Sequence, residues 1–360
     1  MFDKDKPYND LPPLPPSTEI ENTEILKTAI GANKSLAELK GMAKTIPNQS
    51  ILINSLPLQE AKSSSAIENV LTTSDKLFEA FASQAKDYDP QTKEVLRYKE
   101  ALWEGFDRLS RNNLLTTNLF INIYQKIKET TAGIRNTPGT KIATSTGQVI
   151  YTPPEGENLI RDKLANLEKY INSADDKIDP LIKLAVIHYQ FEAIHPFTDG
   201  NGRTGRIINI LYLVQQKLLE LPVIYLSRYI IENKNDYYNL LKTVTEKNEW
   251  SSWILYILRG ILNTAETTVN KIVDIKNLLD KTIVDMKQKL PSRIYSKELI
   301  ELLFTQPYCK VEFVVNAGIS KRQTAAEYLK EIENTSLLKS KKVGKEVLYL
   351  NQPLFELLRN

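Results

Sequence analysis

One stretch restricts the fold of this chain more than any other feature: a polar, glycine-rich loop between two mostly apolar runs. Residues 180–194 and residues 207–214 each have the apolar spacing of a buried helix. Residues 195–206 between them contain one histidine, one aspartate, one asparagine, three glycines and two arginines. The sequence therefore predicts a mainly α fold in which a tight loop leaves one buried helix and enters the N-terminus of the next.

The backbone and arginines of this loop are suited to bind a polyphosphate. Unpaired N–H groups and the helix dipole make a helix N-terminus an anion site. Gly200, Gly202 and Gly205 would let phosphate oxygens reach the backbone, because they have no side chain in the way. Arg203 and Arg206 are three residues apart, so both can point at one phosphate chain.

Two further side chains of the loop would supply chemistry. Asp199 is a hard oxygen ligand suited to Mg²⁺. A histidine ordinarily titrates near neutral pH, so His195 is expected to be able to deprotonate an incoming hydroxyl. The glycines also spell G-x-G-x-x-G, but a predicted helix precedes them where a dinucleotide site needs a strand, and the P-loop pattern does not occur in the sequence.

Residues 195–206 match every fixed position of H-P-F-x-[DE]-G-N-G-R-x-x-R, so the chain resembles the Fic (filamentation induced by cAMP) family. Residues 133–135 and 151–154 are similar to the flap of that family. The resemblance extends from a proline-rich arm at residues 1 to about 20 as far as about residue 265. It implies a helical Fic domain with a small β-hairpin flap. It also implies a protein adenylyltransferase, which moves AMP from ATP to a Ser, Thr or Tyr hydroxyl of a target protein or of itself.

The resemblance implies a role for each residue of the loop. His195 would be the general base, and Asp199 would hold Mg²⁺ against the α- and β-phosphates of ATP. Asn201 and the N–H of Gly202 would contact the α-phosphate, and Arg206 would contact the γ-phosphate. The full set of implied ATP-binding residues is Gly200, Asn201, Gly202, Arg203, Thr204, Gly205 and Arg206.

A second segment, residues 64–69, resembles the inhibitory motif [ST]-x-x-x-E-[GN] of the same family. This resemblance implies an inhibitory role for Ser64 and Glu68, in which Glu68 pairs with Arg206 and denies the γ-phosphate its partner. From the residues alone, Pro57 predicts a helix break, and the serines that follow predict the capped start of a new helix. An ordinary capped helix is therefore the alternative interpretation.

Residues 141–152 have the composition of a short β-hairpin with its turn at 145–147. A small hairpin inside a helical domain has few strands to pair with. Its open edge is therefore a predicted docking site for a segment of the target protein, by strand addition.

The C-terminal residues 291–360 have a different character. Predicted helices at 296–305, 311–317 and 321–334 are followed by a basic hairpin at 339–350, which is the order of a winged helix. The candidate DNA contacts are Lys321, Arg322, Gln323, Lys341 and Lys342. Glutamates share the last helix, so a module that contacts only protein is the alternative.

These patterns divide the chain into four predicted parts. Residues 1–114 form an arm and an inhibitory helical segment, and residues 115–265 form the catalytic Fic domain. Residues 266–290 form a linking helix, and residues 291–360 form the winged helix. Three alternative functions stay open: removal of AMP, another phosphate-containing transfer on the same fold, and a DNA-binding regulator whose Fic domain senses nucleotide. Gly202 in place of a lysine favours adenylylation over a kinase-like reaction.

The composition sets the remaining expectations. A chain of 360 residues with net charge +3 is expected to form two or three domains, and it is not basic enough to be coated by nucleic acid over its whole surface. The single cysteine, Cys309, fits a reducing compartment. We find no apolar run long enough for a signal peptide or a membrane span, so we expect a soluble, cytoplasmic protein. The oligomeric state is left open, a homodimer included.

Overall fold

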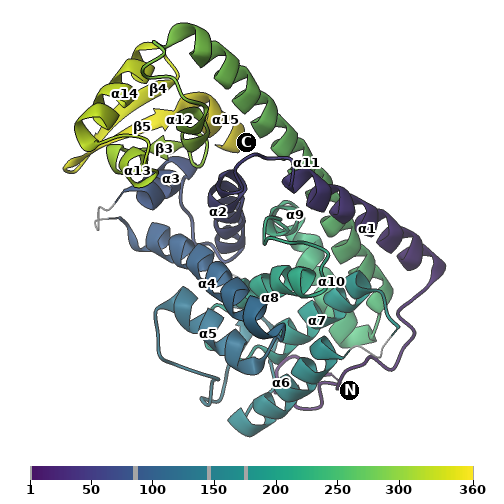
Figure 1. The fold of residues 1–360 in the computed structure, drawn as a ribbon. Helices are drawn as coiled ribbons and strands as arrows, with labels where there is room; N and C mark the ends of the chain where they lie inside the picture. Colours follow the sequence, from purple (N-terminus) through teal and green to yellow (C-terminus); the bar gives the residue numbers. More distant parts are fainter. Residues whose placement is uncertain (1, 84–87, 144–146, 174–176, 360) are drawn as a thin grey trace.

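The computed structural model describes residues 2–83, 88–143, 147–173 and 177–359, and it confirms a mainly α fold (Figure 1). The first helices in chain order are α1 (Thr23–Ala43), α2 (Ser50–Ile67), α3 (Ser74–Ala82), α4 (Pro90–Asn112), α5 (Thr117–Lys128), α6 (Glu157–Asn172), α7 (Pro180–Ile194), α8 (Asn201–Gln215), α9 (Ser227–Glu232), α10 (Lys234–Lys247) and α11 (Trp250–Lys289). Between α5 and α6, the strands β1 (Ile142–Ala143) and β2 (Val149–Tyr151) form an antiparallel pair.

The two helices that flank the glycine-rich loop are buried. Nearly every residue of α7 and α8 is inaccessible to solvent, including the polar side chains of His188 and Asn209. α7 packs against α6, α8 and α11, and Trp253 of α11 donates a hydrogen bond to the carbonyl of Ala185 at 2.8 Å. Both ends of the loop are therefore fixed by the core.

The N-terminal arm, residues 2–22, is laid over the outside of this core. Gln190 Nε2 of α7 donates to the carbonyl of Pro12 at 2.9 Å, and Lys163 Nζ of α6 donates to the carbonyl of Leu11 at 2.8 Å. After the arm, α1 lies along α11, as Figure 1 shows. The arm is thus an extended strap that covers α6 and α7.

One prediction was wrong, because Pro57 does not break a helix. It lies inside α2, which continues to Ile67. Pro57 and its neighbours Leu56 and Leu58 are buried, and α2 packs against α4, α8 and α9. This packing outweighs the one backbone hydrogen bond that a proline cannot donate. Ser64 consequently lies near the end of a helix, and it does not precede the start of a new one.

The C-terminal module has the predicted order with two additions. It contains α12 (Lys297–Leu302), β3 (Tyr308–Cys309), α13 (Val311–Asn316), α14 (Arg322–Asn334), β4 (Leu338–Val343), β5 (Glu346–Asn351) and α15 (Gln352–Arg359). The strands form one antiparallel sheet in the order β3-β5-β4, and β4 and β5 are the two strands of the predicted hairpin. The short β3 and the terminal α15 were not predicted.

The helix α11 connects this module to the rest of the chain. It is continuous over 40 residues and runs through the predicted boundary at 265/266. Figure 1 shows the module at one end of α11, close to α3, and Phe78 of α3 packs edge-on against Phe355 of α15 with ring centroids 6.3 Å apart. Among the described segments, no helix has both the length and the hydropathy that a membrane crossing requires.

Candidate functional site

The backbone of the glycine-rich loop is in the left-handed region at both ends. His195 caps α7 with φ 49°, and Gly200 precedes α8 with φ 75°. The side-chain amide of Asn201 closes the loop, because its Oδ1 accepts from the N–H of Phe197 and its Nδ2 donates to the carbonyl of Phe197, both at 2.8 Å. Both atoms of this amide hold the loop closed, which leaves one N–H of Nδ2 and the backbone N–H of Asn201 for a phosphate.

An aromatic stack holds the loop against the core. Phe197 is completely buried, and its ring lies parallel to that of Tyr124 from α5, with centroids 4.1 Å apart. The hydroxyl of Thr204 donates to the carbonyl of Gly200 at 2.9 Å. Gly205 faces α7, where a Cβ atom would lie 3.0 Å from the ring of Phe191. In this structure Thr204 and Gly205 therefore serve the packing of α8.

His195 is held beside a guanidinium group. Arg135 Nε donates to the carbonyl of His195 at 2.7 Å, and His195 Nδ1 is a buried atom without a hydrogen-bond partner among the described residues. Burial, and after it the charge of Arg135, lowers the pKa of His195 to about 4. The imidazole is therefore neutral at pH 7, which is the form that accepts a proton.

Arg206 is bound by the segment that resembles an inhibitory motif. It is almost completely buried, and its Nε donates to the hydroxyl of Ser64 at 2.7 Å. Its Nη2 donates to the carbonyl of Ser64 and to Glu68 Oε1, both at 2.9 Å. The structure thus brings Ser64, Glu68 and Arg206 together, although more than 130 residues separate the segment from the loop in the sequence.

Gly202 is the residue that makes room for this ion pair. A Cβ atom at that position would lie 2.3 Å from Glu68 Oε1 and 2.8 Å from Arg206 Nη1. Carbon and oxygen atoms do not approach so closely without a bond, so any side chain at residue 202 would displace the carboxylate. Glu68 therefore lies directly over the N-terminus of α8, where the sequence predicts the anion site.

Arg203 belongs to a separate cluster of charges. Its Nη1 contacts Glu94 Oε1 of α4, and the same carboxylate oxygen accepts from Lys128 Nζ of α5 at 2.9 Å. Lys128 Nζ also lies 2.7 Å from Asp199 Oδ2, and Arg203 Nη2 lies 3.8 Å from Asp199 Oδ1. Burial acts in the opposite direction, but the Lys128 ammonium holds the pKa of Asp199 below its usual value. Nothing in the sequence connects Glu94 and Lys128 to the loop.

The donor set around Asp199 fits Mg²⁺ rather than a metal held by protein alone. The described residues include no group of three or more His, Cys, Asp and Glu side chains that could hold a metal ion. Asp199 is a single carboxylate with 62% of its side chain exposed. Mg²⁺ is usually bound by one or two carboxylates together with substrate phosphates and water, which matches one exposed aspartate beside an anion site.

The predicted hairpin is present as two very short strands. β1 and β2 pair antiparallel with Ile142 opposite Tyr151, and the predicted turn falls partly on residues 144–146, which lie outside the described residues. Tyr151 Oη donates to the carbonyl of Ala193 at 2.8 Å, so the end of β2 is fixed two residues before His195. The N-terminal arm contacts the chain just after β2, because the N–H of Tyr8 donates to the carbonyl of Thr152 at 3.0 Å.

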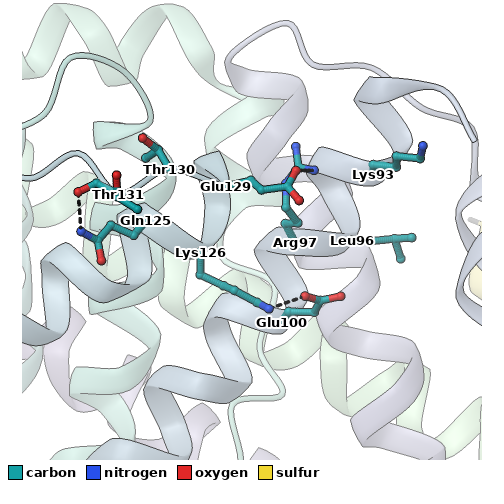
Figure 2. Close-up of a pocket in the computed structure, with 9 residues that line it drawn as sticks. All are labelled: Lys93, Leu96, Arg97, Glu100, Gln125, Lys126, Glu129, Thr130 and Thr131. Carbon is teal, nitrogen blue, oxygen red and sulfur yellow. Dashed lines mark hydrogen bonds and ion pairs between the residues drawn. The ribbon is translucent and has the colours of Figure 1, made fainter. Parts of the chain in front are cut away.

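An open groove of about 870 Å³ lies between α4 and α5, outside the loop (Figure 2). Figure 2 shows that charged side chains line this groove and pair with one another. Lys126 Nζ lies 2.8 Å from Glu100 Oε2, and Arg97 Nη1 lies 2.9 Å from Glu129 Oε2. None of the groove residues belongs to the glycine-rich loop, so this hollow is not the predicted site.

The candidate DNA contacts fall into two groups in the structure. Lys321, Arg322 and Gln323 are exposed at the start of α14, and Lys342 is exposed on β4. Lys341 is instead bound to α3: its Nζ lies 3.3 Å from Asp75 Oδ2 and also contacts Glu79. One of the predicted DNA-binding lysines of the β4–β5 hairpin therefore faces α3.

The fold and this loop define a helical Fic core with an N-terminal segment packed on it. Three family models match the chain: Fic/DOC family N-terminal over residues 26–107, Fic/DOC family over residues 114–213, and the C-terminal domain of SoFic-like protein adenylyltransferase over residues 278–354. The chain belongs to the Fic/DOC family.

Named relatives are similar to this chain over part of its length. The protein adenylyltransferase fic-1 of Caenorhabditis briggsae is 32% identical over 99 residues, which cover 27% of this chain and 18% of the relative. A probable protein adenylyltransferase of Aquifex aeolicus is 45% identical over 53 residues, which cover 15% of this chain and 17% of the relative. The chain spans about a fifth or less of the length of the curated relatives it matches.

Solved structures agree with the fold. A Fic family protein from Desulfovibrio desulfuricans superposes with a TM-score of 0.55 at 17% identity, covering 94% of this chain and 98% of that chain. Fic-1 (aa134 - 508) from Caenorhabditis elegans gives a TM-score of 0.52 at 17% identity, covering 70% of this chain and 74% of that one.

Proposed function

We propose that this chain is a protein adenylyltransferase that moves AMP from ATP to a Ser, Thr or Tyr hydroxyl of a target protein or of itself, and that Glu68 restrains it. One observation carries the proposal. A histidine with a lowered pKa caps α7 at the start of the loop that enters α8, and the last arginine of residues 195–206 is held by a glutamate from outside them. The names of the relatives support the reaction type.

Each residue of the loop has a part in the proposed reaction. His195 removes the proton from the target hydroxyl, whose oxygen attacks the α-phosphorus while the bond to pyrophosphate breaks. The N–H groups at the start of α8 and the guanidinium of Arg203 stabilise the charge on the phosphates. Mg²⁺ would be held by Asp199 and would neutralise charge on the α- and β-phosphates. The protein thus contributes position and electrostatics.

Glu68 opposes this reaction in two ways. It binds the Nη2 of Arg206, which the γ-phosphate would otherwise use, and its carboxylate lies over Gly202 at the anion site. A negative carboxylate and a negative phosphate cannot share that place, because like charges at short range repel strongly. ATP that enters beside Glu68 would consequently be held in a pose unsuited to transfer.

The target segment is proposed to dock on residues 141–152. The described strands of this hairpin are only half-buried, and Tyr151 fixes β2 next to the end of α7. A target strand added to this edge would be held by backbone hydrogen bonds, with its hydroxyl close to His195.

Labelled ATP tests the proposal directly. We expect His195→Ala to abolish transfer of label from [α-³²P]ATP to protein and Glu68→Gly to raise it. The mass of the modified protein separates the reactions, because AMP and phosphate add very different masses. Unchanged transfer in both variants, or a phosphate-sized mass shift, would contradict adenylylation. A loss of label from modified protein that requires Glu68 would indicate AMP removal instead.

A second function, DNA binding, is favoured by the exposed start of α14. Lys321, Arg322 and Gln323 lie together at a helix N-terminus, which is where helix-turn-helix modules contact base edges. We expect the full chain to shift a DNA duplex in a gel at low salt and less at high salt, because phosphate contacts weaken with salt. No shift of DNA by the full chain at low salt would argue for a module that contacts only protein. A Lys321→Ala/Arg322→Ala variant that shifts DNA equally well would show that the DNA contacts lie elsewhere than at the start of α14.

A further inference from the structure

Lys128 lies at the anion site although it is outside the glycine-rich loop. Its aliphatic chain passes over Gly200, where a Cβ atom would lie 3.4 Å from Lys128 Cδ. Its ammonium lies 2.7 Å from Asp199 Oδ2 and 2.9 Å from Glu94 Oε1. Lysine is a common phosphate-binding side chain, and here it is mounted beside the helix N-terminus that is proposed to bind one.

Lys128 and its neighbour Arg203 differ in their freedom to move. Both cations contact the same oxygen of Glu94, which keeps two positive groups together at the start of α8. Arg203 is 1% exposed, so burial fixes its position, whereas 25% of the Lys128 side chain is exposed. A lysine also has a flexible stem of four carbons. Lys128 is therefore the member of the pair that can turn toward a ligand.

A divalent cation that binds Asp199 Oδ2 would repel the ammonium that now lies 2.7 Å from this oxygen, because like charges at short range repel strongly. The ammonium would then stay attached to Glu94. Lys128, Arg203, Glu94 and Asp199 together have no net charge. When a metal neutralises Asp199, the other three have a net charge of +1 at the place where the phosphates would lie.

We propose that Lys128 is a nucleotide-binding residue of this site, whose ammonium neutralises Asp199 and turns onto the polyphosphate when a divalent cation takes that carboxylate. The inference rests on the proposed function, because it requires the nucleotide to bind at the start of α8. It assigns a role in binding to a side chain of α5, and it makes Glu94 the group that orients both cations.

Calorimetry with a nucleotide that cannot react tests this inference. The probe is the ATP analogue with a methylene group between the α- and β-phosphorus atoms, and the protein is the full chain with Glu68→Gly. We expect the added change Lys128→Met to weaken binding about tenfold at saturating Mg²⁺, since a charge-assisted contact is lost. In EDTA the loss should be larger, because Asp199 then repels the phosphates without a counter-charge.

Lys126→Met is the matched control. Lys126 lies two residues away on α5, and its ammonium pairs with Glu100 in the groove of Figure 2. We expect it to leave the affinity unchanged with and without Mg²⁺, and we expect Lys128→Arg to retain most of the affinity. Thermal unfolding without nucleotide checks that each variant is folded.

The outcomes separate the two proposals. If the analogue does not bind the Glu68→Gly chain that keeps Lys128, the proposed function fails. If it binds but Lys128→Met behaves like Lys126→Met, the proposal for Lys128 is overturned and the lysine is only a structural tie between α5 and the loop. A loss by the same factor with Mg²⁺ and in EDTA would overturn the proposed movement of the ammonium from Asp199 to the polyphosphate.

Discussion

Arg203 and Arg206 lie one turn apart on α8 and are both almost completely buried, yet the glutamates that bind them are mounted differently. Glu94 lies within α4, between residues that are packed in the core. Glu68 is the C-cap of α2, and the next residue, Asn69, has φ 61°. A carboxylate inside a helix moves only with the helix. A carboxylate at a helix end can leave when the following loop changes conformation.

The rest of α2 is tied down, which confines any movement to its end. Glu60 is completely buried in α2 and accepts hydrogen bonds from Tyr98 Oη at 2.9 Å and from the N–H of Ser227 at 3.0 Å. These contacts join α2 to α4 and α9. Glu94 is thus held within a packed helix, whereas Glu68 lies at a helix end, as the proposed release of Arg206 requires.

The largest effect is expected from Glu94→Ala. The change leaves the buried Arg203 and the partly buried Lys128 without their shared partner, and an uncompensated buried charge costs roughly 3 kcal/mol. We expect the free energy of unfolding in urea to fall by about this amount and transfer to fall with it. Glu68→Gly should instead raise transfer. An increase of transfer in Glu94→Ala would show that Glu94 is also inhibitory and would remove the distinction.

The pH dependence of the free energy of unfolding tests the environment of His195 without altering either glutamate. The pKa of His195 is lowered to about 4 by burial and Arg135, whereas an unfolded chain takes up that proton near pH 6.5. The unfolded state thus binds more protons between these values, so His195 makes stability fall as the pH drops from about 6.5 to about 4. We expect the pH dependence to flatten in His195→Gln.

The same titration can be followed by NMR, because the chain has only two histidines. His188 is buried against Tyr237, with its Nε2 2.9 Å from Tyr237 Oη, and burial lowers its pKa to about 3. We expect neither imidazole to titrate near pH 6.5. A His195 signal that changes at that pH would mean that about a quarter of the base is protonated at pH 7.

A smaller effect should come from Gly202→Ala, measured in two backgrounds. In the native chain the new Cβ would lie 2.3 Å from Glu68 Oε1 and must displace it, so we expect a cost of about 1–2 kcal/mol in the free energy of unfolding. With Glu68→Gly the cost should be clearly smaller. The change in helix propensity is common to both backgrounds and cancels in the cycle. Equal costs would show that the carboxylate spends little time over Gly202.

Residue type and spacing within short segments made the glycine-rich loop predictable from the sequence, but not the residues that pack against it. The loop, its helices and the order of the C-terminal module all follow from spacing and residue type within short segments. The position of α2 did not, since Pro57 argues for a break and only the packing of its neighbours on α4 and α9 overrides it. Glu94 and Lys128 are ordinary charged residues of amphipathic helices, and only the tertiary arrangement makes them part of the site.

The smallest effect is expected from Ser64→Ala, and it asks which atoms hold Arg206. The guanidinium donates three hydrogen bonds to the end of α2, one of them to the hydroxyl of Ser64. The other two acceptors, the carbonyl of Ser64 and the carboxylate of Glu68, remain in the variant. One lost hydrogen bond costs about 1 kcal/mol. We therefore expect transfer to rise a few-fold, well below the rise in Glu68→Gly, with Ser63→Ala, one residue earlier on α2, as control. If Ser64→Ala released transfer as fully as Glu68→Gly, the hydroxyl would set the position of Arg206, and the mobile carboxylate would only follow it.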